Sequence, residues 1–176
     1  MVKIKFMLFS ILSLPYFCMA GECKTNICIF DNAIESYKNE DDRLNTEYKK
    51  VRAFLSDEKF LKVKEVQKLW IKYRDEKCSD AAYKPSDTGE ESKINRALCL
   101  SHMSSARSIE LRMIYDSDFR NSINYVYGSF LRAGFYGKQR KKTTLENEYI
   151  DNNCRSLDSV IEGFDKEFCK ERMSTP

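Results

Sequence analysis

The chain is poor in the residues that form turns and tight loops. Of its 176 residues, six are glycine and three are proline. This scarcity disfavours sandwiches of many short strands and favours long helices. The glycines are also too scattered to form a phosphate-binding loop or a dinucleotide-binding fingerprint. The composition therefore argues against nucleotide-dependent enzymes.

Histidine and closely paired cysteines are scarce as well. His102 is the single histidine, and no Cys-x-x-Cys motif occurs. Serine-nucleophile chemistry needs an oriented histidine, and zinc sites usually combine cysteine with histidine. We therefore expect no metal, no cofactor and no enzymatic activity. A glycosidase-like pair of carboxylates stays open, because no spacing singles one out among the 27 acidic residues.

A long apolar run occurs only at the start of the chain. Residues 1–20 combine a basic start, an apolar stretch, and small residues at the positions that a signal peptidase reads. We expect them to be a cleaved signal peptide, so that the protein is exported to the periplasm or secreted. A lipid anchor would need a small residue directly before the modified cysteine. Because Phe17 precedes Cys18 and Glu22 precedes Cys23, we expect no lipid anchor, and no transmembrane segment in the mature chain.

Beyond this segment, apolar residues recur at steps of three and four, which indicates amphipathic helices. The clearest pattern runs from Phe30 to Leu55 and has Asp41 at one of its apolar positions. An acid on a buried helix face needs a partner, so we expect Asp41 to pair with Arg74 or Arg107 rather than to act in catalysis.

Further helices are predicted for residues 57–82, from Ser92 or Lys93 to Met113, for residues 119–131 and for residues 150–168. The fold class is therefore all-α, a small helical bundle stapled by disulfides. We expect residues 21–116 to form a domain of three helices. Residues 117–176 are expected to form a helical extension packed on that domain.

The stretch from Trp70 to Cys78 holds the only tryptophan. Steps of four place Trp70, Arg74 and Cys78 along one face of a helix. We expect the Trp70 ring to pack between the first and third helices, with Tyr73 on the same apolar pattern. Arg74 is expected to pair with Asp41 or Glu110.

Six cysteines remain after cleavage of the signal peptide, which allows fifteen disulfide connectivities. Cys78–Cys99 is favoured, because antiparallel helices joined by a loop bring these positions together. Cys154 can reach Cys169 only if the last helix breaks, for instance near Gly163, since fifteen helical residues span about 22 Å. Otherwise Cys154 and Cys169 each pair elsewhere, with Cys23 or Cys28 as the alternative partners. A Cys23–Cys28 bridge requires that this stretch is not yet helical.

Several short motifs occur in a specific order between Cys23 and Tyr115. They are Cys23 with Ile27-Cys28, Asp41-Asp42-Arg43-Leu44-Asn45-Thr46-Glu47-Tyr48, Gln67-x-x-Trp70-x-x-x-Arg74-Asp75-x-x-Cys78, and Cys99-Leu100 with Arg107-x-x-Glu110-Leu111. In combination they resemble the N-terminal domain of the LprI-type lysozyme-inhibitor family of exported bacterial proteins. The resemblance implies a small, disulfide-stapled helical domain in the bacterial envelope, with a role in restraining lysozyme.

The implied partner is a lysozyme-like cell-wall hydrolase. A lysozyme cleft works with two carboxylates, so a basic loop could enter between them. The candidate for such a contact is the basic stretch Lys138, Arg140, Lys141 and Lys142. The alternative is an immunity or envelope-stress protein that binds another secreted effector. Nucleic acid is not an expected partner of an exported protein.

Overall fold

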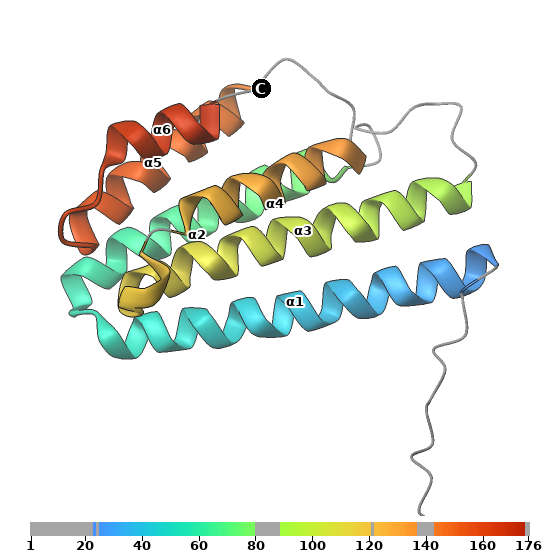
Figure 1. The fold of residues 1–176 in the computed structure, drawn as a ribbon, viewed down its shortest axis with the longest axis horizontal. Coiled ribbons are helices and arrows are strands. Elements are labelled where there is room, and N and C mark those ends of the chain that lie inside the picture. The colour runs from blue at the N-terminus through green and yellow to red at the C-terminus, as the bar shows by residue number, and fades with distance from the viewer. Residues whose placement is uncertain (1–22, 24, 80–88, 121, 137–142, 175–176) are drawn as a thin grey trace, which may run out of the picture.

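The computed structural model describes residues 23, 25–79, 89–120, 122–136 and 143–174 (Figure 1). In these ranges the chain forms six α-helices and one short 3₁₀ helix, with no strand. The helices are α1 (Asn26–Phe54), α2 (Asp57–Lys77), α3 (Gly89–Tyr115), α4 (Ile123–Tyr136), α5 (Thr144–Val160) and α6 (Lys166–Ser174), and the 3₁₀ helix is η2 (Ser117–Phe119). The all-α fold class predicted from the sequence is confirmed.

The ends of the helices carry recognisable capping residues. The Thr25 hydroxyl accepts a hydrogen bond from the Cys28 backbone N–H at the start of α1, and the Thr143 hydroxyl accepts one from Glu146 at the start of α5. Asp57 and Glu58 lie in the first turn of α2, where the helix dipole favours acids. Local sequence therefore defines where these helices begin.

Helices α1 and α3 lie side by side and run in the same direction (Figure 1). The hydroxyl oxygens of Ser36 and Ser101 lie 2.8 Å apart, and Arg43 donates to the Ser108 hydroxyl at 3.1 Å. In both pairs the residue of α3 comes 65 positions after its partner in α1. Serines at Ser101, Ser104, Ser105 and Ser108 make this contact narrow and polar. A constant offset of this kind is the signature of a parallel pair.

The other helices complete the bundle around this pair. α4 packs on α3, α5 packs on α2, and α6 packs on α5 and α4. The buried core runs through all of these contacts, from Leu44 and Val51 in α1 to Leu157 in α5 and Met173 in α6. Residues beyond 116 therefore contact the first three helices over a continuous apolar interior. No helix in the described part of the chain is long and apolar enough to cross a membrane.

Several helix boundaries differ from the sequence-based expectations. α2 ends at Lys77 instead of residue 82, α3 begins at Gly89 instead of Ser92 or Lys93, and α4 continues to Tyr136. The expected helix over residues 150–168 is two helices, α5 and α6. Gly163 in the turn between them has φ +72°, a left-handed conformation that glycine adopts without steric cost.

Three disulfides staple the helices, and each joins cysteines whose Cα atoms lie within 6 Å. Cys78–Cys99 (5.7 Å) joins the end of α2 to α3, as the sequence favoured. Cys154–Cys169 (5.8 Å) joins α5 to α6, which the break at Gly163 makes possible. Cys23–Cys28 (5.6 Å) closes although Cys28 already lies in the first turn of α1, so the expectation that this bridge needs non-helical chain is wrong. Cys23 itself precedes the helix, which is sufficient.

Candidate functional site

One face of the stretch from Trp70 to Cys78 is part of the interior. Trp70 is 1% exposed, and Tyr73 and Cys78 are also buried. The Arg74 guanidinium lies over the indole ring at 5.0 Å from its centroid and forms an ion pair with Asp75 at 2.8 Å. The expectation that Arg74 pairs with Asp41 or Glu110 is therefore wrong, because the guanidinium pairs with the neighbouring Asp75. The placement of the Trp70 ring between the first and third helices stays a prediction.

Asp41 also differs from the expectation. Its carboxylate is half-exposed and accepts a hydrogen bond from Asn45, one turn along the same helix. It pairs with neither Arg74 nor Arg107. The buried acid of α1 is Glu47, which contacts the Tyr115 hydroxyl and forms an ion pair with Lys50 at 3.0 Å. With 3.6 residues per turn, positions spaced by three or four residues shift gradually around the helix. Asp41 therefore lies at the edge of the buried face of α1 and not at its centre.

A polar network fills the centre of the bundle. Arg107 donates to Glu110 at 2.9 Å, to Asn153 at 2.7 Å and to Gln67 at 2.8 Å. Glu110 also accepts hydrogen bonds from Tyr149 and Asn153, both at 2.7 Å. Every partner comes from α2, α3 or α5, so the network joins residues of the expected extension to the first three helices.

A second polar contact extends this network towards the surface. The rings of Tyr73 and Tyr149 stack with centroids 5.0 Å apart, and the Tyr73 hydroxyl donates to Glu146 at 2.9 Å. Lys77 lies 3.4 Å from the same carboxylate. Burial raises the pKa of Tyr73 well above 10.0, and the nearby Glu146 carboxylate adds to the effect. Neutral, stacked tyrosines in this position have a structural role.

His102 lies on the same helix as Arg107 and Glu110. The histidine is half-buried on α3, where burial and the nearby Arg132 cation lower the pKa of its side chain. Among the described residues, no group of three or more His, Cys, Asp or Glu side chains is placed to hold a metal ion. The basic residues Lys138, Arg140, Lys141 and Lys142 lie outside the described ranges.

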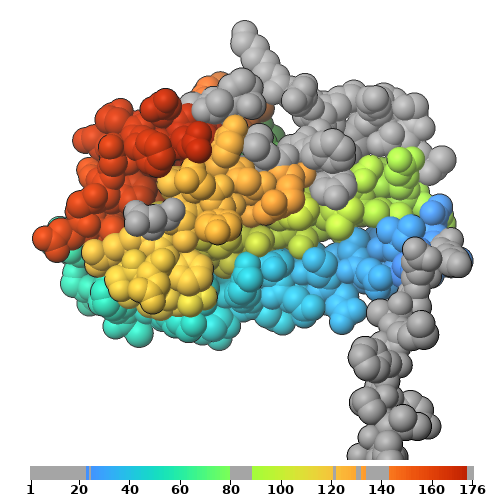
Figure 2. Space-filling view, in the orientation of Figure 1, coloured from blue at the N-terminus to red at the C-terminus, as the bar shows by residue number. Residues whose placement is uncertain are grey.

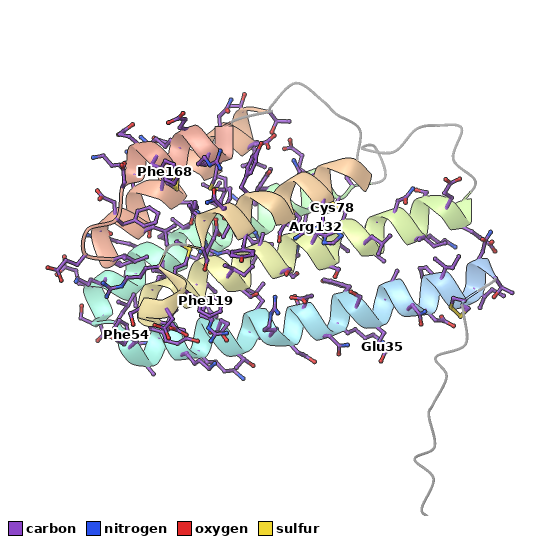
Figure 3. All side chains as sticks on the ribbon, viewed as in Figure 1. Glu35, Phe54, Cys78, Phe119, Arg132 and Phe168 are labelled. Atoms are coloured by element: carbon purple, nitrogen blue, oxygen red, sulfur yellow. A yellow bond between two sulfur atoms is a disulfide. The ribbon has the colours of Figure 1, made fainter. Side chains whose placement is uncertain are left out.

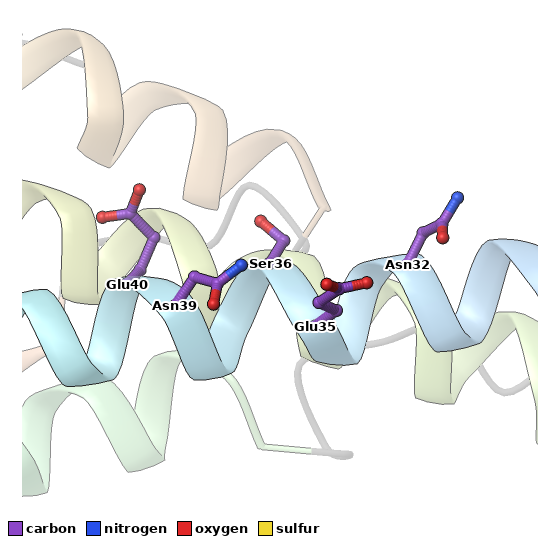
Figure 4. Close-up of a pocket in the computed structure, with 5 residues that line it drawn as sticks. All are labelled: Asn32, Glu35, Ser36, Asn39 and Glu40. Atoms are coloured by element: carbon purple, nitrogen blue, oxygen red, sulfur yellow. The ribbon is translucent and has the colours of Figure 1, made fainter. Parts of the chain in front are cut away.

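The outer surface of α1 is the feature that the sequence-based reasoning missed. A shallow, open depression between this surface and the α1–α3 contact is lined by polar side chains of α1 (Figure 4). They are Asn32, Glu35, Ser36, Asn39 and Glu40. Glu35 points away from the other helices at the edge of the molecule (Figure 3), and α1 forms the lower edge of the space-filling view (Figure 2).

This surface is acidic. Within residues 26–42 of α1 there are five acids and a single basic residue, Lys38. Asp31, Glu35 and Asp42 are exposed, and the described part of the chain provides no ion pair to them. Their spacing of four and seven residues places them on one side of the helix, which they share with Lys38, seven residues after Asp31. We call these three residues the acidic stripe; its periodicity is the signal that could have identified it from the sequence.

The acidic stripe lies within the part of the chain that matches a known family. The model of the family described as "Lysozyme inhibitor LprI" matches residues 18–111, which include α1, α2 and most of α3. No curated protein and no solved structure matches the chain. Since the family match covers more than half of the sequence, the chain belongs to the LprI family.

Proposed function

We propose that this protein is a non-enzymatic inhibitor that binds lysozyme or a related cell-wall hydrolase outside the cytoplasm. The family match over residues 18–111 carries the proposal. The expected signal peptide, residues 1–20, supports a periplasmic or secreted location, and three disulfides suit an oxidising compartment. In this proposal residues 21–116 form the inhibitor domain, and residues 117–176 brace it through the Arg107–Glu110 network.

The acidic stripe is the surface of that domain with the best charge complementarity to the partner. Lysozymes are commonly cationic, so negative charge on the inhibitor increases the rate of encounter. Of the three matched helices, α3 is covered by α1 and α4, and the outer face of α2 is rich in lysine. Residues 26–42 of α1 are the longest exposed acidic segment among them, because the exposed acids Glu90 and Glu91 of α3 are confined to its first turn. Asn32 and Asn39 add hydrogen-bonding groups beside the acids.

The inhibition itself is tested with lysozyme and a suspension of bacterial cell walls. A tenfold molar excess of the purified mature protein should slow the loss of turbidity. Undiminished lysis at that excess would remove the proposal.

The surface is tested with a charge-reversal variant, Asp31→Lys, Glu35→Lys and Asp42→Lys. We expect its affinity for lysozyme to fall about tenfold or more at low salt, with a smaller difference at high salt, because screening weakens steering. The matched control reverses three exposed acids on other elements, Glu76, Glu148 and Glu162. Equal loss in both variants would show that net charge matters and that the acidic stripe does not.

A further inference from the structure

Helix α2 presents an unusual combination of side chains to solvent. Leu61, Lys64, Lys68, Ile71 and Lys72 are all exposed. With 100° per residue, these five positions lie within a sector of about 100° on the helix surface. We call them the α2 stripe. On the opposite side of the helix Val63, Val66, Trp70 and Tyr73 are buried in the core, and Phe60 is buried next to the edge of the α2 stripe.

Two members of the α2 stripe are large aliphatic residues. Leu61 is 56% exposed and Ile71 is 40% exposed. The two positions are ten residues apart, which is about 15 Å along a helix. The core already takes its apolar residues from the other side of α2, so packing within the described part of the chain does not account for Leu61 and Ile71.

The charge around the two aliphatic residues is positive. Between Lys59 and Lys72 there are five lysines and one acid, Glu65. Glu65 pairs with Lys68 at 2.8 Å. Lys64 and Lys72 have no ion pair in the described ranges of the chain.

Two of the four acids in the end turns of α2 are compensated, and the other two, Glu58 and Glu76, are exposed but lie outside the sector of the α2 stripe. Asp57 pairs with Arg52 at 2.7 Å, and Asp75 pairs with Arg74 at 2.8 Å. Their negative charges therefore do little to neutralise the lysines between them. The α2 stripe presents a net positive surface with apolar side chains interspersed.

We propose that the α2 stripe is a docking surface for a bilayer that contains anionic phospholipids. Lysine ammonium groups interact with lipid phosphates, while aliphatic side chains enter the boundary between headgroups and acyl chains. A soluble polyanion would use the lysines alone, so the exposed Leu61 and Ile71 favour the bilayer. This interaction is separate from binding to a hydrolase and does not depend on it.

Docking by α2 would also orient the molecule. An anionic bilayer attracts Lys64, Lys68 and Lys72 and repels Asp31, Glu35 and Asp42 of the acidic stripe. The preferred orientation therefore holds α2 towards the lipid and keeps the acidic stripe of α1 accessible. An inhibitor held in this way would meet cationic proteins that approach the membrane.

Co-sedimentation with lipid vesicles tests the proposal on the full mature chain. Vesicles of phosphatidylglycerol and phosphatidylcholine in equal amounts should bind the protein at low salt, with binding that decreases as salt is added. Vesicles of phosphatidylcholine alone should bind at least tenfold less. Equal sedimentation with both vesicles, or with neither, would overturn the proposal.

Two variants separate the charged from the apolar contribution. Lys64→Glu, Lys68→Glu and Lys72→Glu together should reduce binding at least tenfold, whereas reversing the exposed lysines Lys38, Lys49 and Lys93 should change it less than threefold. Leu61→Ser with Ile71→Ser keeps the charge and should still weaken binding several-fold. All substituted side chains are exposed, so circular dichroism should show native helix content. Binding of the Leu61/Ile71 variant at the wild-type level would overturn bilayer docking in favour of a simple polyanion contact.

Discussion

Arg107 and Glu110 form a salt bridge in the centre of the bundle, with 2.9 Å between Nη1 and Oε2. The two side chains are 2% and 0% exposed. Asn153 of α5 joins both partners, since its carbonyl oxygen accepts from Arg107 and its amide donates to Glu110. The two charges therefore compensate each other, and both groups also have neutral hydrogen-bonding partners, which is the condition under which a buried ion pair is tolerated.

Removing one partner of this pair should destabilise the fold strongly. Arg107→Met leaves the Glu110 carboxylate buried without its cation, and we expect a loss of about 3–5 kcal/mol in the free energy of unfolding. Urea denaturation followed by circular dichroism measures this loss. The control is Arg155→Met, which removes an exposed ion pair with Asp151 and should cost less than about 1 kcal/mol. Equal losses in the two variants would contradict a structural role of the Arg107–Glu110 network.

The buried tyrosines predict a loss of stability at alkaline pH. Burial, and then the Glu110 carboxylate, raise the pKa of Tyr149 well above 10.0. An unfolded tyrosine ionises near pH 10, so above that pH the folded chain holds a proton that the unfolded chain releases. The stabilisation is therefore complete below pH 10 and decreases as the pH rises towards the raised pKa of Tyr149.

Urea denaturation between pH 8 and pH 11 tests this dependence. Tyr149→Phe should be less stable than the wild type at pH 8 by about 1–3 kcal/mol, because Glu110 loses a hydrogen bond. The difference should narrow as the pH approaches 11. Tyr125→Phe is the control, since Tyr125 is 70% exposed. A constant difference between wild type and Tyr149→Phe over this range would contradict the prediction.

Helical periodicity predicted the fold class, because each long helix buries one side of a regular pattern. It could not predict which polar residue on that side is buried. Asp41 and Glu47 are both acids on the inner half of α1. A small difference in their angular position around the helix buries Glu47 and leaves Asp41 half-exposed, where it accepts a hydrogen bond from Asn45. That difference depends on how α1 packs against α3, and the sequence of α1 alone does not contain it.

The partners of Arg107 were also beyond the reach of local patterns. Gln67, Glu110 and Asn153 come from three helices, and Asn153 lies outside the part that resembles the family. By contrast, Cys78–Cys99 followed from helix ends and loop length, and Cys154–Cys169 depended on a break that Gly163 signalled. The acidic stripe could have been predicted from the spacing of Asp31, Glu35 and Asp42 alone. The apolar periodicity does not include these residues, so it gave no sign of the stripe.

The three disulfides should differ in their response to mild reduction. Cys23 and Cys28 are half-exposed, whereas Cys78, Cys99, Cys154 and Cys169 are at most 1% exposed. Reduction requires access of a thiolate to a sulfur atom. We expect that low concentrations of dithiothreitol followed by iodoacetamide label Cys23 and Cys28 first, as read by peptide mass spectrometry. Labelling of the other four cysteines should require urea, and their labelling at the same rate in native buffer would contradict the prediction.

Trp70 should be a determinant of stability rather than a contact for the partner. Its side chain is 1% exposed, so Trp70→Ala should lower the free energy of unfolding by about 3–5 kcal/mol, as for other large aromatic residues in cores. Trp70→Phe should recover part of this loss because it refills most of the space. Ile27→Ala is the exposed control, since Ile27 is 70% exposed, and should have little effect. Thermal melting measures all three variants. An unchanged melting temperature in Trp70→Ala together with lost inhibition of lysozyme would instead make this stretch part of the binding surface.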